Sequence, residues 1–401
     1  MKIGVIGGGA AGFFAAIHAS GPDREVMLFE KSPKLLSKVR ISGGGRCNVT
    51  HRPMEISKLV KFYPRGEKFL KRIFRHFSIK DTIDWFEGRG VPLKEEADGR
   101  IFPLSNTSES IIQALLQEAA HKGVQILKNF PVKSIVPEVD GIRVFSAESE
   151  VLVDQLIVAT GGSPKLDGYH FLSQLKHHLI SPIPSLFTFN TPHESIRDLM
   201  GISVPNAHVR LEGTKLSYQG PVLITHWGIS GPAVLKLSAF GAAWLHDHSY
   251  KAHAIINWNA ELKEQDWDTS IRNYKSLHGN RKVKNYPLFD LPLRLWEFLV
   301  QNSGIEPNFT YGNLSKKQIN RLVQNLFCYI LQVEGKTTFK EEFVTAGGVD
   351  LREVNPDTME SIFHPKIFFA GEVLNVDGIT GGFNFQAAWS TGFLAGRSTH
   401  L

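Results

Sequence analysis

The most constraining feature of this sequence is the order of the segments in its first thirty residues. The apolar run "KIGVIG" is typical of a strand, and the glycine-rich turn "GGGAAG" follows it at 7–12. A stretch of small residues, typical of a helix that packs closely on a sheet, leads to "EVMLFE", which predicts a second strand ending in Glu30. A strand, a glycine turn, a helix and an acidic strand end in this order predict a Rossmann-type dinucleotide-binding unit.

The glycines and the acid each have a role in that prediction. Gly7 forms the tight turn, Gly9 lets the backbone approach a pyrophosphate, and Gly12 lets the helix lie against the strand. The helix N-terminus then faces the anion. Glu30 lies 18 residues after Gly12, close to the spacing expected of an acid that binds ribose hydroxyls.

A second glycine-rich stretch, "SGGGRCNVT" at 42–50, begins soon after Glu30. We interpret it as a loop that passes over the same cofactor and not as a second nucleotide site. Its Cys47 is either a packing residue beside the cofactor or a proton donor in catalysis. The chain has two cysteines, Cys47 and Cys328, which match no metal-ligand spacing, so no metal site is predicted and a reducing compartment is favoured.

The rest of the chain predicts an interrupted nucleotide fold. Helical spacing at 67–77 and 108–123 is followed by strand-like runs from 124 to 162. Residues 185–258 contain several β-type runs, and 260–336 are polar and helix-like. We therefore expect an α/β protein with a discontinuous Rossmann-type FAD-binding domain and two inserts. The predicted bounds are 1–188 and 343–401 for the FAD domain, 189–259 and 337–342 for a β-rich, barrel-like insert, and 260–336 for a small helical insert.

The C-terminal segment favours FAD over NAD as the resident dinucleotide. "FFAGE" at 368–372 predicts a strand that ends in Glu372, whose carboxylate can accept hydrogen bonds from ribityl hydroxyls. The helix after Gly381 and Gly382 can direct its positive N-terminus at the pyrimidine edge of a flavin and stabilise the charge of the reduced ring. The sequence has no second complete GxGxxG unit. NAD(P)H is therefore expected to visit the flavin transiently as the reductant.

Charge and hydropathy bear on partners and location. The net charge is +6 and the pI is about 9.1, which mildly favours anionic partners. Eight Lys or Arg residues lie between Lys58 and Lys80 and could bind RNA phosphates or simply form a solvated face. No run of about 18 apolar residues predicts a membrane span. The first residues could pass for a secretion signal, but their glycines stand where the nucleotide fold needs them, so a cytoplasmic protein is expected.

The motifs along the whole chain resemble those of a known family. They are "GGGAAG" at 7–12, "SGGGRCNVT" at 42–50, "GRIFP" at 99–103, "ATGG" at 159–162, "THWGISGPAVLKLS" at 225–238, "TAGGV" at 345–349 and "FAGEVLNVDGITGGFNFQAAWSTGFLAG" at 369–396. The chain resembles the BaiN/RdsA family of NAD(P)/FAD-dependent oxidoreductases. The resemblance implies a two-part FAD domain with a barrel-like and a helical insert.

Two positions depart from the family pattern. Leu36 and Ser37 precede Lys38 where the family usually has Gly-Arg, which could alter phosphate or NAD(P)H contacts. Asn375 stands where the family often has Asp, which weakens any role for an acid there in proton transfer.

The motifs and the resemblance together give a set of candidate site residues. Cys47 and His226 are the candidates for catalysis, and a structural role is the alternative for both. Arg46 and Asn48 could bind phosphate or the flavin carbonyls. The cofactor-binding candidates are Gly7, Gly9, Ala10, Ala11, Gly12, Glu30, Lys31, Lys38, Gly45, Arg46, Cys47, Asn48, Val132, Ala159, Thr160, Gly161, Gly371, Glu372, Asp377, Gly381, Gly382, Phe383 and Asn384.

The substrate is predicted less firmly than the cofactor. The family's activities include reduction of conjugated C=C bonds in steroid-like acids, oxidation of small amines, and reduction of a uracil in large-subunit ribosomal RNA to dihydrouridine. We favour the last, with ribosomal RNA as partner. A small-molecule enone reductase or amine oxidase is the alternative, and a flavin-binding scaffold without catalysis is a third hypothesis. No oligomeric state is predicted.

Overall fold

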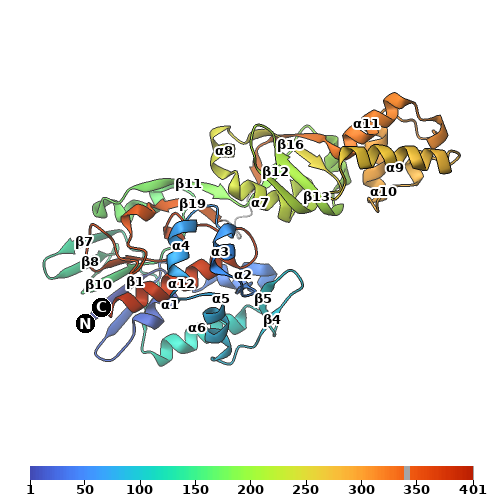
Figure 1. Cartoon of the computed structure of the whole chain (residues 1–401). Helices are drawn as coiled ribbons and strands as arrows, with labels where there is room; N and C mark the ends of the chain where they lie inside the picture. Colours follow the sequence, from blue (N-terminus) through green and yellow to red (C-terminus); the bar gives the residue numbers. More distant parts are fainter. Residues whose placement is uncertain (338–343, 401) are drawn as a thin grey trace. The chain divides into compact units, whose positions relative to one another are not determined.

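The computed structural model describes residues 1–337 and 344–400 (Figure 1). The chain divides into two compact units, one of Met1–Ser185 with Phe339–Leu401 and the other of Leu186–Thr338. Residues 338–342 of the predicted β-rich insert and residue 343 of the predicted FAD domain lie outside the described residues. No helix in the described part of the chain is both long enough and apolar enough to cross a membrane.

A five-stranded parallel sheet forms the centre of the first unit. Its order is β20-β10-β1-β2-β6, and every neighbouring pair is parallel. The apolar residues of the three central strands are almost all buried, as expected of a parallel sheet covered on both faces. The strands are β1 (Lys2–Ile6), β2 (Glu25–Phe29), β6 (Gln125–Leu127), β10 (Gln155–Val158) and β20 (Ile367–Phe369).

Two helices from opposite ends of the chain pack closely beside this sheet. They are α1 (Ala10–Ala19), which follows β1, and α12 (Phe383–Ser398), near the C-terminus (Figure 1). A Cβ at Gly392 would stand against the carbonyl oxygen of Ala11, and one at Gly396 against that of Ala15. These glycines therefore let the two helix backbones approach, and α12 completes a fold that β1 and α1 begin.

The remaining elements of the first unit surround this core. Helices are α2 (Ser37–Gly45), α3 (Ile56–Leu59), α4 (Glu67–Ile73), α5 (Ile79–Glu87) and α6 (Glu109–His121), with short 3₁₀ turns at Val60–Phe62, Leu166–Leu175, Leu351–Glu353 and Gly371–Val373. Three small sheets are β3-β5-β4, β7-β8-β9 and β11-β19. Their strands are β3 (Thr50–His51), β4 (Leu93–Glu95), β5 (Arg100–Pro103), β7 (Ser134–Glu138), β8 (Gly141–Phe145), β9 (Glu150–Val153), β11 (Leu179–Ser185) and β19 (Val344–Val349).

The second unit is built on a seven-stranded antiparallel sheet of order β17-β16-β13-β14-β15-β12-β18. The strands are β12 (Thr188–Asn190), β13 (Ser203–Leu211), β14 (Ser217–Ile224), β15 (Gly228–Ser230), β16 (Lys251–Asn257), β17 (Tyr329–Glu334) and β18 (Lys336–Thr337). Its helices are α7 (Pro232–Phe240), α8 (Ala242–Asp247), α9 (Glu264–Leu277), α10 (Leu293–Asn302) and α11 (Lys316–Phe327), with 3₁₀ turns at Ser195–Leu199, Val283–Asn285 and Tyr311–Asn313.

The end of the predicted helical insert differs from the structure. Residues 260–336 were expected to be helical, yet Tyr329–Glu334 forms β17 and pairs with β16. Buried and exposed side chains alternate along β17, a period of two that marks a strand with one face on a core. The helical part of this unit thus ends at Phe327.

Candidate functional site

The turn between β1 and α1 leaves an open space at a helix N-terminus. Gly7 has φ +114°, and a Cβ on Gly12 would overlap the Gly7 carbonyl oxygen, so both positions need glycine. Gly9 is the N-cap residue of α1 and supplies no capping side chain, and apart from its two chain neighbours no described residue comes within 4 Å of where its Cβ would stand. The first N–H groups of α1, from Ala10 and Ala11 onward, are therefore available to an anion, as predicted for a pyrophosphate.

The carboxylate of Glu30 is held at the end of β2, next to this turn. Its Oε2 accepts a hydrogen bond from the Gly8 N–H at 2.8 Å. Its Oε1 accepts from the Ser32 N–H and from the Ser32 hydroxyl, both at 2.9 Å. These bonds fix the orientation of the Glu30 carboxylate, and its binding to ribose hydroxyls stays a prediction.

A cavity of about 320 Å³ opens at the carboxyl ends of β1, β2 and β10. This edge of a parallel sheet is where ligands bind in doubly wound folds, and the volume is within the range of small-ligand pockets. Ala159, which directly follows β10, is buried and does not line the cavity. The predicted residues that line it are Gly7, Glu30, Lys31, Val132, Thr160 and Gly161.

Lys38 and Glu372, which are 334 positions apart, form an ion pair in the first unit. The Lys38 Nζ lies 2.7 Å from the Glu372 Oε2, and the Glu372 Oε1 accepts the Thr345 N–H at 2.9 Å. The adjacent Gly371 donates its N–H to the Thr391 hydroxyl of α12 at 2.9 Å. The strand β20, the start of α2 and the helix α12 are thus tied together at the predicted acid.

The second glycine stretch is the unwound end of α2. Ser42, Gly43 and Gly44 leave the helical conformation. Apart from the neighbouring backbone of the same segment, Cβ atoms built on Gly44 and Gly45 would meet no described residue within 4 Å. This backbone therefore leaves room for a cofactor to approach, and the predicted contact with the cofactor stays a prediction.

Cys47 follows this stretch in an unusual environment. Its φ is +61° and its N–H donates to the Ser42 carbonyl at 2.9 Å. The side chain is 0% exposed, and burial raises the pKa of its thiol to about 12. Burial and a weakly acidic thiol are the properties of a packing residue, and the role of Cys47 as a proton donor stays a prediction.

The neighbours of Cys47 contact other parts of the site. The side-chain amide of Asn48, oriented to satisfy its surroundings, accepts the Gly382 N–H at the start of α12 at 2.9 Å and donates to the Thr50 carbonyl at 2.9 Å. Arg46 pairs with Glu96 at 2.6 Å, and its guanidinium lies 4.1 Å from the centre of the Phe102 ring. Asn48 therefore links the second glycine stretch to α12.

A buried polar network strengthens that link. The Thr50 hydroxyl donates to the Gln386 Oε1 at 2.6 Å, and the Thr82 hydroxyl donates to the same oxygen at 3.0 Å. The indole N–H of Trp389 donates to the Val49 carbonyl at 3.0 Å. Gln386 and Trp389 are fully buried, so α12 is fixed against the segment that carries Cys47.

The start of α12 is shaped by stacked rings. The Phe383 ring lies 4.9 Å from the His51 ring and 4.5 Å from the Phe62 ring, close to parallel with both. The Asn384 amide donates to the Gly378 carbonyl and accepts the Gly378 N–H, both at 2.8 Å. The N-cap residue of this helix, Gly382, has φ +89° and supplies no capping side chain.

Asp377 is a fully buried carboxylate just before these glycines. Arg65 binds both of its oxygens, and the Ser185 hydroxyl donates to its Oδ2 at 2.7 Å. Burial raises the pKa of Asp377, whereas Arg65 and Ser185 lower it. Arg65 was missing from the predicted site because no local motif marks a partner 312 residues away.

His226 belongs to the second unit, in the turn between β14 and β15. It is exposed, and its ring lies 4.4 Å from the ring of Trp227. The other predicted site residues all lie in the first unit. The role of His226 in catalysis stays a prediction.

These residues fit FAD. The uncapped N-terminus of α1 with the open space at Gly9 suits a pyrophosphate, and Glu30 beside the cavity suits an adenosine ribose. Glu372 and the uncapped N-terminus of α12 suit the ribityl chain and the flavin ring.

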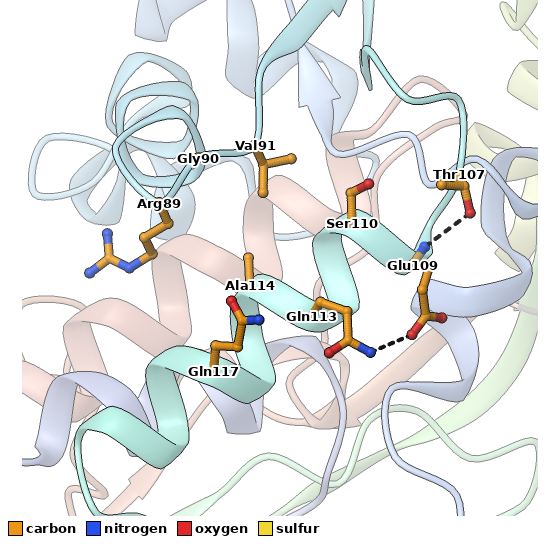
Figure 2. Close-up of a pocket in the computed structure, with 9 residues that line it drawn as sticks. All are labelled: Arg89, Gly90, Val91, Thr107, Glu109, Ser110, Gln113, Ala114 and Gln117. Atoms are coloured by element: carbon orange, nitrogen blue, oxygen red, sulfur yellow. Dashed lines mark hydrogen bonds between the residues drawn. The ribbon is translucent and has the colours of Figure 1, made fainter.

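A second hollow of about 410 Å³ lies elsewhere in the first unit, between the end of α5 and α6 (Figure 2). Glu109 there already pairs with Arg40 at 2.5 Å and accepts the Gln113 amide at 2.6 Å. The hollow shares no lining residue with the cavity at the strand ends and contains none of the predicted site residues.

Comparison with known proteins agrees with this geometry. The family described as "HI0933-like protein Rossmann domain" matches residues 1–398. The chain belongs to this family. Membership and the architecture confirm the Rossmann-type FAD-binding fold, the FAD cofactor and the class of FAD-dependent oxidoreductases that the sequence predicted.

The similarity to curated relatives extends over nearly the whole length of the chain. It is 30% identical to "Ribosomal RNA dihydrouridine synthase" of Escherichia coli over 396 residues, 96% of this chain and 95% of the relative. It is 27% identical to "3-dehydro-bile acid delta(4,6)-reductase" of Clostridium scindens over 407 residues, 99% of this chain and 98% of the relative. A solved 3-ketosteroid-delta4-(5alpha)-dehydrogenase from Rhodococcus jostii superposes with a TM-score of 0.51 at 15% identity, over 100% of this chain and 97% of that one, and shows the shared fold.

Proposed function

We propose that this protein reduces the C5–C6 double bond of a uracil in large-subunit ribosomal RNA to give dihydrouridine, with NAD(P)H as the reductant. The observation that carries the proposal is the similarity, over nearly the full length, to the ribosomal RNA dihydrouridine synthase of Escherichia coli, at 30% identity. The relative of the same name in Haemophilus influenzae is also 30% identical, over 98% of this chain.

The site supplies the parts that such a reduction needs. When bound, FAD accepts a hydride from NAD(P)H and delivers one to the substrate. The residues that would hold it are those of the β1–α1 turn, Glu30, Glu372 and the N-terminus of α12. In the net reaction NAD(P)H and a proton are consumed, hydride ends on C6, a proton ends on C5, and NAD(P)⁺ is released.

The protein must also give the uracil access to the cofactor and provide a proton. A uracil stacked in folded RNA has to be turned out of its stack to reach an enclosed cofactor. Protonation of C5 needs an acid or an ordered water nearby. Cys47 and His226 are the residues that we propose to test for this step.

Exposed Lys and Arg residues of the first unit support an RNA substrate. Of the eight Lys and Arg residues between Lys58 and Lys80, Lys61 pairs with Glu67, Arg65 with Asp377, and Arg72 with Asp357. The other five, which are all exposed and form no ion pair within the described residues, are Lys58, Lys68, Lys71, Arg75 and Lys80. Such a surface suits a phosphate backbone, and a ribosomal RNA substrate would place the protein in the cytoplasm.

Mass spectrometry of large-subunit ribosomal RNA tests the proposal. We expect the RNA of a deletion strain to lack one dihydrouridine that the parent strain contains, and a plasmid copy of the gene to restore it. Purified protein with FAD and NAD(P)H should convert the same uridine in RNA from the deletion strain. Identical uridine masses at every position in both strains would refute the proposal.

A small conjugated ketone or acid is the second candidate substrate. The 27% identity to the Clostridium scindens reductase, again over nearly the full length, favours it. NAD(P)H consumption driven by free enones in the absence of RNA, together with unchanged ribosomal RNA, would select this function over the first. The amine oxidase that the sequence also allowed has no comparable named relative among those above.

A further inference from the structure

The helical part of the second unit carries a basic surface that cofactor binding does not use. Residues 269–289 and 307–333 together contain eight Lys or Arg residues and no Asp or Glu. Protein surfaces usually intersperse both signs of charge, whereas the charged residues of these two stretches are all positive. Five of the eight lie on α9 or α11, and the other three lie at 281–284, after α9. Figure 1 shows α9 and α11 at one end of the second unit.

Backbone contacts bring the two stretches side by side. The Gly312 N–H donates to the Gly279 carbonyl at 2.7 Å, and the Tyr311 N–H donates to the Arg281 carbonyl at 2.9 Å. Lys282 and Thr310 form an antiparallel bridge. Charges that are distant in sequence therefore add up on one part of the surface.

Almost all of these Lys and Arg residues form no ion pair with an acidic side chain within the described residues. Arg272 forms an ion pair with Asp268 at 2.7 Å. Within the described residues, the other seven form no ion pair with a carboxylate, and we call them the basic helical end. They are Lys275, Arg281, Lys282, Lys284, Lys316, Lys317 and Arg321.

Two of these bases lie where helix stability disfavours them. Lys316 and Lys317 occupy the first turn of α11, at the positive end of the helix dipole, and that turn has no acid. The reciprocal hydrogen bonds of Ser315 and Gln318 cap the helix in spite of them. A choice of residues that works against the local helix is expected where a surface serves a ligand.

Aromatic side chains lie among the basic side chains of this surface. The Arg281 guanidinium stands 4.7 Å from the centre of the Tyr286 ring, and Tyr286 is 40% exposed. Arg281 also donates to the Tyr274 hydroxyl at 2.9 Å. Basic side chains combined with partly exposed aromatic rings are typical of surfaces that bind single-stranded nucleic acid. The rings stack on nucleobases, and the cationic side chains contact phosphates.

We infer that the basic helical end is a docking surface for ribosomal RNA, separate from the residues that hold the cofactor. Charge complementarity with phosphate selects this partner over an apolar or acidic one. The inference rests on the proposed function, because it names the surface by which that substrate is held. It assigns Lys284 and Lys317 to phosphate contacts and Tyr286 to stacking.

Binding of a large-subunit ribosomal RNA transcript to the full-length FAD-loaded protein tests the inference. The probe variant is Lys284→Gln/Lys317→Gln. The matched control is Lys215→Gln/Lys251→Gln, which removes the same charge from exposed positions of the second unit outside the basic helical end. Dissociation constants are measured at several salt concentrations, and the flavin content and melting temperature are recorded to show that each variant is folded.

The probe variant should bind the transcript at least about fivefold more weakly than the control. The slope of log affinity against log salt should fall by about 1.4 to 1.8 for two lost phosphate contacts. Its flavin content and its rate of flavin reduction by NAD(P)H should match the wild type. Tyr286→Leu, without a change of charge, should weaken binding and leave the slope unchanged.

The outcomes separate the surface from the reaction. If probe and control bind equally while the wild type still forms dihydrouridine, the docking surface is wrong and the proposed function stands. If the probe alone loses RNA binding but the wild type forms no dihydrouridine, the surface stands and the proposed reaction fails. A wild-type protein that does not bind the transcript overturns the inference.

Discussion

Arg65 binds both carboxylate oxygens of Asp377 across 312 positions of sequence, and Asp377 is fully buried. This pair joins the segment before α4 to the segment before the glycines of α12. Because Gly381 and Gly382 open the N-terminus that would face a flavin, the pair holds the start of α12 in place as well as satisfying a buried charge.

Removal of Arg65 should therefore destabilise the protein strongly. Arg65→Ala leaves the Asp377 carboxylate buried without its cation, which typically costs about 3–5 kcal/mol. Arg72→Ala is the matched control, since Arg72 pairs with Asp357 in the same way but both side chains are about half exposed, and it should cost about 0–1 kcal/mol. Urea denaturation of both variants measures the difference. Equal losses in the free energy of unfolding would show that the buried pair stabilises the protein no more than the exposed pair does.

Substitution of Gly9 should separate folding from cofactor binding. Gly9→Asp introduces a favoured N-cap residue and a negative charge at the positive end of α1, so the apoprotein should be as stable as the wild type or about 1 kcal/mol more stable. The same charge would stand where we expect the pyrophosphate. The FAD content, measured as flavin absorbance per protein, should therefore fall at least about tenfold.

Gly9→Asn is the control for that experiment. It caps the helix as Asp does, has nearly the same shape, and carries no charge, so its loss of FAD should be clearly smaller. If Gly9→Asp retains FAD at the wild-type level, the turn between β1 and α1 is not the pyrophosphate site.

Cys47 tests the two hypotheses that the sequence left open. Because the thiol is fully buried and its pKa is raised to about 12, we expect Cys47→Ala to keep turnover within about threefold of the wild type and to lose about 1 kcal/mol of stability. Steady-state turnover and thermal unfolding measure the two effects. A tenfold or larger loss of turnover with normal FAD content, about 1.4 kcal/mol of barrier, would establish Cys47 as the proton donor instead.

The sequence predicted those parts of the site that local patterns encode. The turn at Gly7 to Gly12 and the acid Glu30 follow a fixed order within thirty residues, and all of them take the predicted places in the fold. Glycine, helix and strand signals are short-range, so one segment is enough to identify them.

Other contacts depend on partners that only the fold brings together. The Arg65–Asp377 pair and the bonds from Thr50 and Thr82 to Gln386 each join residues more than 300 positions apart. The left-handed backbone of Cys47 also has no sequence signal, because cysteine rarely adopts it. Strand β17 was missed because six alternating residues follow directly on a long helical segment.

The last prediction concerns His18 on α1. Its Nδ1 lies 2.8 Å from the Phe14 carbonyl, and its ring packs 4.8 Å from that of Phe393. Burial lowers the pKa of His18 to about 4, from the usual 6.5. Between pH 6.5 and about 4, His18 is therefore protonated in the unfolded chain but stays neutral in the folded protein. The free energy of unfolding falls as the pH falls through this range.

The size of this loss follows from the two pKa values. Between pH 7.5 and pH 5.0, His18 should lower the free energy of unfolding by about 2 kcal/mol. His18→Phe keeps an aromatic ring in the same packing and removes the titrating group, so its pH dependence should be smaller than that of the wild type by this amount. Urea titrations of both proteins at the two pH values measure it. An equal fall in both would mean that His18 does not contribute to the acid sensitivity of the fold, and that other groups do.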